Sequence, residues 1–151
     1  MSKLIILSGL PGSGKTTYIE SLKTQGFTGP IYDDYYATQH NERIDTVEDV
    51  DRNKDPVKNE RFEQLITDLK NNPEVIVADI IFYIARHRNS LLVAVLNRMP
   101  NIDLKFVYLP VKIDTSIENI EKRNRNDRVT IEKELVRYIA DRATKITVTE
   151  L

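Results

Sequence analysis

The chain has 151 residues, the length of one ordinary domain, and its formal charge of -1 does not fit a strongly basic nucleic-acid binder. It contains no cysteine, which excludes disulfides, thiolate catalysis and cysteine-based metal sites. No stretch approaches the roughly 18 apolar residues that cross a membrane, and the apolar run at residues 4–7 is too short for a signal peptide. We therefore expect a cytoplasmic protein, and no feature of the sequence indicates a membrane or a stable protein partner.

The first half of the chain alternates short apolar runs with longer amphipathic segments. Residues 4–8 predict a buried parallel strand, because a strand covered on both faces is continuously apolar. A glycine-rich turn then leads into a predicted helix at 15–24, followed by a brief strand at 31–33. The segment 40–56 is acidic and without periodicity, which indicates a loop or an irregular helix. The next helix is expected to begin at Pro56, since proline is tolerated in a first helical turn.

The middle of the chain repeats this alternation. Residues 74–79 and 103–109 predict two further strands, separated by an amphipathic helix at 84–99. Strands that alternate with helices in this way predict right-handed crossover units and a parallel sheet. We find no linker that would divide the chain and therefore expect one α/β domain over residues 1–151.

Two helices and a final strand are predicted at the carboxyl end. Thr115 and Glu118 have the spacing of a capping box, which predicts a helix from there to about residue 125. Thr130 can cap a second helix that runs to about residue 143. The alternating pattern of residues 145–151 predicts an edge strand, the fifth of the sheet.

A phosphate-binding loop is predicted between the first strand and the first helix. Its glycines permit positive φ angles, so that successive amide groups face inward and the helix N-terminus points at an anion. Lys15 is expected to contact the β- and γ-phosphates of ATP, and the Thr16 hydroxyl is expected to bind Mg²⁺. Thr17 completes the donor site. The residues that match the motif G-x-x-x-x-G-K-[ST] are Gly9-Leu10-Pro11-Gly12-Ser13-Gly14-Lys15-Thr16.

Carboxylates stand where the second and third strands should end, which is where open α/β sheets bind ligands. Asp33 or Asp34 can accept a proton from an attacking hydroxyl, and either can equally cap the next helix. Tyr36 can stack on a base or sugar of the acceptor, or can be ordinary packing. Asp79 fits a Mg²⁺ or substrate-binding carboxylate, with a plain strand terminus as the alternative.

Basic residues gather at two further places. The segment 122–128 carries four positive charges and one negative charge between two predicted helices. A lid bearing Arg123, Arg128 and Arg125 could close on the transferring phosphoryl group, although a solvated helix end is the alternative. Arg86, with the two basic residues that follow it, could meet an acceptor phosphate or could simply start a helix in solvent.

Taken in order, these pieces resemble the small P-loop kinases, in particular the 5′-hydroxyl polynucleotide kinase domain and its uncharacterised AAA-type ATP-binding relatives. The resemblance implies a three-layer P-loop NTPase sandwich, with helices on both faces of a five-stranded parallel sheet of order 2-3-1-4-5. It spans nearly the whole chain, and its only highly specific motif is the P-loop. The pieces that carry it are Gly9 to Thr17, Asp33-Asp34-Tyr35, Val75-Ile76-Val77-Ala78-Asp79, and Lys122-Arg123-Asn124 with Arg128.

The resemblance also implies roles for individual residues. Asp33 matches the catalytic base, Asp79 the carboxylate that helps to hold the acceptor, and Arg123 with Arg128 the lid arginines on the donor phosphates. The sequence departs from the family at Tyr36, where the family carries an arginine that contacts the acceptor phosphate. The lid spacing is also one residue longer, so that Arg125 can share the lid role.

The leading hypothesis is therefore a Mg·ATP-dependent kinase that phosphorylates the 5′-hydroxyl of a nucleic acid or nucleoside. One alternative is a nucleoside monophosphate kinase or another small-molecule kinase, in which Arg86 would bind a second phosphate. The other is a P-loop ATPase or nucleotide-binding switch, but Asp79 is not followed by the glutamate that commonly activates water in such proteins. The chain has no Asn-Lys-x-Asp sequence, which argues against a guanine-specific GTPase.

Overall fold

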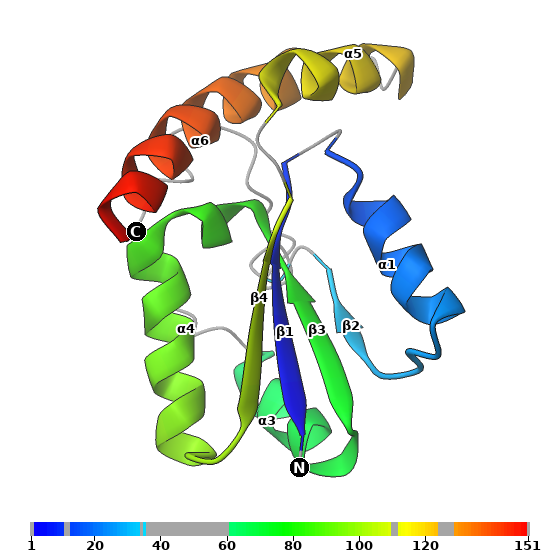
Figure 1. Ribbon diagram of the computed structural model, residues 1–151, viewed down its shortest axis with the longest axis vertical. Helices are drawn as coiled ribbons and strands as arrows, with labels where there is room; N and C mark the ends of the chain where they lie inside the picture. The colour runs from blue at the N-terminus through cyan, green and yellow to red at the C-terminus, as the bar shows by residue number, and fades with distance from the viewer. Residues whose placement is uncertain are drawn as a thin grey trace.

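The computed structural model describes residues 2–10, 13–33, 35, 61–109, 112–123 and 129–150. Helices and strands alternate along these residues and form an α/β fold (Figure 1). The segment 40–56 lies outside the described residues, as does the predicted helix start at Pro56. The elements are β1 (Lys3–Ser8), α1 (Lys15–Thr24), β2 (Ile31–Tyr32), α3 (Phe62–Asn71), β3 (Glu74–Ala78), the 3₁₀ helix η4 (Ile80–Tyr83), α4 (Ala85–Arg98), β4 (Asp103–Tyr108), α5 (Ile113–Arg123) and α6 (Val129–Glu150).

The strands form one parallel sheet in the order β2-β3-β1-β4. Leu4 of β1 lies in register with Val75 of β3 on one side and with Leu104 of β4 on the other. β1 is therefore central, and the loop that follows it leaves from the middle of the carboxyl edge of the sheet. This arrangement confirms the predicted parallel sheet and the predicted order of its first four strands.

Each face of the sheet is covered by helices, which makes the predicted three layers (Figure 1). Ile5 and Leu7 of β1 pack on one face with Ile19 of α1. Leu4 and Ile6 point to the other face and join the cores of α3, α4 and α6. Because both faces are buried, β1 and β3 carry continuous apolar runs, which is why the sequence predicted them correctly.

α5 and α6 arch over the carboxyl ends of the strands (Figure 1). The two helices pack on each other, and an ion pair between Lys133 and Glu121 joins them. α6 also contacts η4, the short helix that follows β3. α5 and α6, the helices on either side of the predicted lid segment, therefore overhang the carboxyl edge of the sheet. This is the edge where parallel sheets bind ligands. No helix within the described ranges is long and apolar enough to cross a membrane.

The predicted fifth strand is wrong. Residues 145–150 form the last part of α6, and the described part of the chain contains a sheet of four strands. Adding a β-branched residue to an existing helix costs only a few tenths of a kcal/mol, whereas a strand needs a neighbouring edge with which to pair. The alternating pattern of the tail was therefore a weaker signal than the helix that precedes it.

The predicted start of α5 is also wrong. α5 begins at Ile113, so Thr115 lies inside its first turn instead of capping it. The amide of Ser116 already donates to the carbonyl of Lys112 at 2.9 Å, which closes the first helical turn before the predicted cap. A threonine and a glutamate three residues apart also fit within a helix, so the spacing alone does not locate its first residue.

Candidate active site

The loop after β1 is shaped by Gly14, which precedes α1. Gly14 has φ 92° and ψ 18°, the left-handed conformation that favours glycine. Its carbonyl accepts the amide of Tyr18 at 2.9 Å, so the first turn of α1 is formed directly behind the loop. The amide of Ser13 in turn donates to the carbonyl of Leu10 at 3.0 Å. These contacts position the helix immediately after the turn, as the motif predicted.

Gly9 is required for a different reason, namely close packing. A Cβ at this position would lie 3.1 Å from Lys15 Cβ, 3.2 Å from Leu109 Cδ1 and 3.2 Å from Ser13 Oγ. The loop therefore folds back closely onto the end of β1, and a side chain here would fit only if these neighbours moved by a few tenths of an ångström. Pro11 and Gly12 of the motif lie outside the described residues.

The N-terminus of α1 has the properties of an anion site. Among the described residues no side-chain hydrogen bond caps the start of this helix at Gly14, and its first turn contains no acidic residue. The partial positive charge of the helix end is thus not compensated from within α1. Thr16 and Thr17 are exposed in this first turn, and Lys15 adds a full positive charge beside them. Such an arrangement is suited to a phosphate group.

Lys15 and Asp33 are brought together by the fold. Lys15 Nζ lies 2.8 Å from Asp33 Oδ1, with the lysine side chain 17% exposed and the aspartate 51% exposed. Asp33 directly follows the short strand β2, at the carboxyl edge of the sheet. The predicted donor lysine and the predicted catalytic base therefore belong to one site. Asp34 and Tyr36 lie outside the described residues.

Asp79 ends β3 beside the loop and is 3% exposed. Its amide donates to the Leu7 carbonyl at 3.2 Å, which holds the end of β3 against the end of β1. The register that pairs Leu7 with Ala78 places Ser8 next to Asp79. The Ser8 hydroxyl is fully buried and has no hydrogen-bond partner among the described residues, so this corner contains a carboxylate and a hydroxyl that can still donate.

The oxygen ligands of this corner fit Mg²⁺. Magnesium takes one or two protein oxygens and completes its shell with water and phosphate oxygens, and the Thr16 hydroxyl and the Asp79 carboxylate are oxygen groups of this kind. The described residues contain no group of three or more metal-ligating side chains, and a magnesium ion that a nucleotide carries into the site does not need one.

Arg61 is a site residue that the sequence analysis missed. Its Nη1 donates to the Asp33 carbonyl at 3.4 Å, and its guanidinium lies 5.4 Å from the centroid of the Tyr32 ring. The Tyr32 hydroxyl donates to Asp68 of α3, and burial, followed by this hydrogen bond, raises the tyrosine pKa. Arg61 precedes α3 and is far from Asp33 in sequence, so only the tertiary fold reveals the contact.

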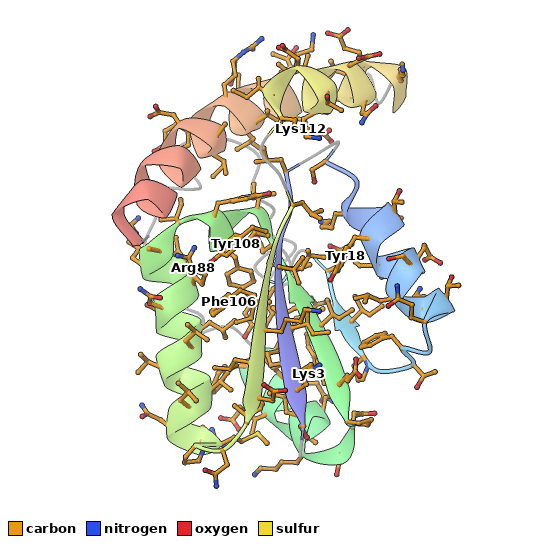
Figure 2. The ribbon with its side chains drawn as sticks, viewed as in Figure 1. Lys3, Tyr18, Arg88, Phe106, Tyr108 and Lys112 are labelled. Atoms are coloured by element: carbon orange, nitrogen blue, oxygen red, sulfur yellow. The ribbon has the colours of Figure 1, made fainter. Side chains whose placement is uncertain are left out.

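The second basic spot divides into two parts. Arg86 is exposed in the first turn of α4, and its Nε donates to His87 at 3.4 Å. Arg88, by contrast, is 3% exposed and donates to a carbonyl of η4 at 2.9 Å. Its guanidinium also lies over the rings of Phe106 and Tyr108 of β4, as Figure 2 shows. Arg88 therefore supports the packing of α4 on the edge strand and is not available for an acceptor phosphate.

The predicted lid falls between α5 and α6. Arg123 is the last residue of α5, which places its backbone at the end of a helix that passes over the sheet edge (Figure 1). Arg125 and Arg128 lie outside the described residues, and nothing is described of the Arg123 side chain. The lid arginines thus remain predictions, although the helices on either side of them overhang the P-loop edge.

The similarity of the chain to known proteins agrees with this geometry. The profile of the AAA domain family matches residues 5–140. Among solved structures 34 chains match, including one described as "Structure of the Pnkp1/Rnl/Hen1 RNA repair complex", with a TM-score of 0.67 and 20% identity. This match covers 98% of the present chain and 46% of the other, so the chain spans less than half the length of that neighbour, and the likeness concerns the fold.

No protein of curated function matches the chain by sequence. The family match confirms the AAA-type resemblance that the sequence indicated, and the structural match agrees with its fold. The family profile extends from β1 to the middle of α6 and includes the P-loop, Asp33 and Asp79. The chain therefore belongs to the AAA domain family.

Proposed function

We propose that the chain is an ATP-dependent kinase that transfers the γ-phosphate of Mg·ATP to a hydroxyl group, with the 5′-hydroxyl of a polynucleotide or nucleoside as the best candidate. The single observation that carries this proposal is the 2.8 Å contact between Lys15 and Asp33. It brings a phosphate-binding lysine and a carboxylate that can serve as a base to the same point at the sheet edge. Residues 1–151 would form one kinase domain.

In the proposed reaction the acceptor hydroxyl approaches Asp33, which takes its proton. The acceptor oxygen forms a bond to the γ-phosphorus, while the bond from that phosphorus to the β–γ bridging oxygen breaks. ADP leaves with the electron pair of the broken bond. Such transfer needs positioning and charge stabilisation more than covalent chemistry, and an anion site of backbone amides beside a lysine supplies both.

The donor would be held by the P-loop amides, the α1 N-terminus and Lys15. Thr16 and Asp79 would hold Mg²⁺, which when bound neutralises charge on the phosphate oxygens. Arg123, Arg125 and Arg128 would close over the transferring group. Each of these residues stabilises negative charge that increases or moves during transfer, which is where such contacts accelerate a reaction.

A polynucleotide acceptor is supported by two observations of different weight. The matched structure is an RNA repair complex, although at 20% identity this similarity extends to the fold alone. Arg61 lies against the Asp33 backbone and so provides a cation close to the base. A hydroxyl with a phosphodiester nearby would fit a base and a cation placed side by side, and Arg61 could then serve where Tyr36 replaces the arginine of the family.

A nucleoside monophosphate kinase is the second candidate function. Its acceptor is itself a phosphate, so it does not require a carboxylate base. Arg86, exposed at the start of α4, is the residue that favours it. An acceptor-independent ATPase receives less support, because Asp79 is followed by the apolar helix η4 and not by a second acidic residue that could activate water.

The proposal is tested by incubating the protein with γ-labelled ATP and Mg²⁺ and a panel of acceptors. The panel contains 5′-hydroxyl DNA and RNA oligonucleotides, nucleosides, nucleoside monophosphates and water alone. Lys15→Ala is the blank, and Asp33→Asn should lower transfer to a hydroxyl by roughly 10²- to 10⁴-fold. Label that appears only on a monophosphate, with Asp33→Asn as active as wild type, would replace the hydroxyl kinase with the second candidate. Label found only in free phosphate would contradict a kinase that acts on the tested acceptors.

A further inference from the structure

The Lys15–Asp33 ion pair joins the two halves of the proposed reaction. Lys15 Nζ is the group expected on the donor phosphates, and Asp33 Oδ1 is an oxygen expected to take the acceptor proton, yet the two lie 2.8 Å apart. The lysine side chain is largely buried and the aspartate side chain is half-exposed. The ion pair with the carboxylate keeps the lysine ammonium group in the site. Each group is thus occupied by the other in the structure.

We propose that this ion pair makes the enzyme bind its substrates in order, with the nucleotide first. The inference rests on the proposed kinase function, because it assigns Lys15 to the donor and Asp33 to the acceptor. The phosphates of a nucleotide carry more negative charge than one carboxylate and compete for Lys15 Nζ. Their binding releases the Asp33 carboxylate, which can then receive the acceptor hydroxyl.

The surroundings of Asp33 allow such an exchange without a change of fold. Its backbone is anchored by the hydrogen bond from Arg61 and by the preceding Tyr32, whose hydroxyl is bonded to Asp68. Its side chain is 51% exposed, so it can rotate from the lysine towards an acceptor. Lys15 is in the first turn of α1, next to the amide groups expected to receive the phosphates. A short side-chain rotation at each end is therefore sufficient.

The competition predicts an unusual effect of one substitution. Asp33→Asn removes the charge of the carboxylate while keeping its size, so Lys15 no longer has to be displaced by the nucleotide. We expect the Kd of ADP or of a non-hydrolysable ATP analogue, measured by titration calorimetry with Mg²⁺, to fall by about two- to fivefold, the range expected for a partly exposed ion pair. A substitution that removes a base would thus tighten binding of the donor.

A double-mutant cycle separates this effect from simple charge repulsion between Asp33 and the nucleotide. In the Lys15→Ala background the ion pair is already absent, so Asp33→Asn should give no further gain in affinity. Glu20→Gln is the matched surface control, because it removes one negative charge from an exposed position of α1, the helix that also carries Lys15. Thermal unfolding by circular dichroism verifies that all variants are folded.

Three outcomes of these binding measurements would overturn the inference. They are an unchanged or weaker affinity in Asp33→Asn, an equal gain in the Lys15→Ala background, and an equal gain from Glu20→Gln. The order itself is tested with a fluorescent 5′-hydroxyl oligonucleotide, which should bind wild type several-fold tighter when the ATP analogue and Mg²⁺ are present. Equal binding with and without the analogue would contradict the order.

Failure of the proposed function can be distinguished from failure of this inference. The binding cycle contains no acceptor and requires no transfer, so its result is independent of turnover. If transfer to every acceptor is absent while the cycle gives the expected result, the kinase assignment is wrong and the competition for Lys15 stands. If transfer occurs and the cycle fails, the kinase assignment stands and ordered binding is rejected.

Discussion

Substitution of Gly14 by alanine tests whether the loop has the conformation described. Gly14 has φ 92°, and an added Cβ would have no atom of the described residues within 4 Å. The cost of the substitution is therefore backbone strain alone, roughly 1–2 kcal/mol for an L-residue in the left-handed region. In a domain of this size about 1 kcal/mol shifts Tm by roughly 2–4 °C, so we expect a loss of about 2–8 °C.

The strain can also be relieved by movement of the loop, in which case it appears as weaker nucleotide binding. A loss of about 1.4 kcal/mol in affinity is a tenfold increase in Kd. We therefore measure both Tm by circular dichroism and the Kd of Mg·ADP by titration calorimetry. Gly14→Asn is the matched control and should lose less, because asparagine tolerates the left-handed region better than alanine.

The result that would refute this reasoning is a Gly14→Ala protein with unchanged Tm and unchanged nucleotide affinity. Gly9→Ala provides a second comparison, since its Cβ would lie 3.1 Å from Lys15 Cβ. There the conflict is with the neighbouring side chains of the site. We expect Gly9→Ala to reduce nucleotide affinity at least as much as Gly14→Ala does.

Three further predictions concern stability. Burial raises the pKa of Tyr35, so this tyrosine stabilises the fold fully below about pH 10 and loses that contribution as the pH rises. When urea unfolding is followed between pH 8 and 11.5, the free energy of unfolding should therefore decrease less for Tyr35→Phe than for wild type. The hydrogen bonds from Arg98 lower the pKa of Glu63, so their contribution to stability is full above pH 4.5 and is lost as the pH falls below it. Glu63→Gln should therefore make the free energy of unfolding decrease less steeply with falling pH. An unchanged decrease would contradict a stabilising contact between Glu63 and Arg98. Arg88→Ala should destabilise the protein by roughly 1–3 kcal/mol, because it removes a buried hydrogen bond to the Phe82 carbonyl and the contacts of Arg88 with two aromatic rings of β4. Arg86→Ala, at an exposed position, should be nearly neutral when both variants are compared by thermal unfolding, and equal losses would contradict the burial of Arg88.

The parts of the fold that the sequence predicted well are those with one dominant physical signal. β1 and β3 carry continuous apolar runs because both of their faces are buried. The helix expected after Pro56 is described from Phe62 onward as α3, and its apolar residues, including Leu65 and Leu69, are buried. The tail at 145–150 had two competing signals, and the helix already begun at Val129 prevailed.

The candidate site shows a similar division. The sequence placed the P-loop and Asp79 at the carboxyl edge of the sheet, where the structure has them, because each directly follows a continuously apolar strand. The contact of Arg61 with Asp33 could not be predicted, since it depends on how the start of α3 lies against the end of β2 in the tertiary fold. The burial of Arg88 was missed for the same reason, because sequence gives charge but not the neighbours that enclose it.

The most direct test of the kinase assignment compares two oligonucleotides that differ only at the 5′ end. One carries a 5′-hydroxyl and the other a 5′-phosphate, and both are incubated with γ-labelled ATP, Mg²⁺ and either wild type or Lys15→Ala. The proposed function predicts label on the 5′-hydroxyl oligonucleotide with wild type, little on the phosphorylated one, and none on either with Lys15→Ala. No label on the 5′-hydroxyl oligonucleotide with wild type, or equal labelling by Lys15→Ala, would contradict it.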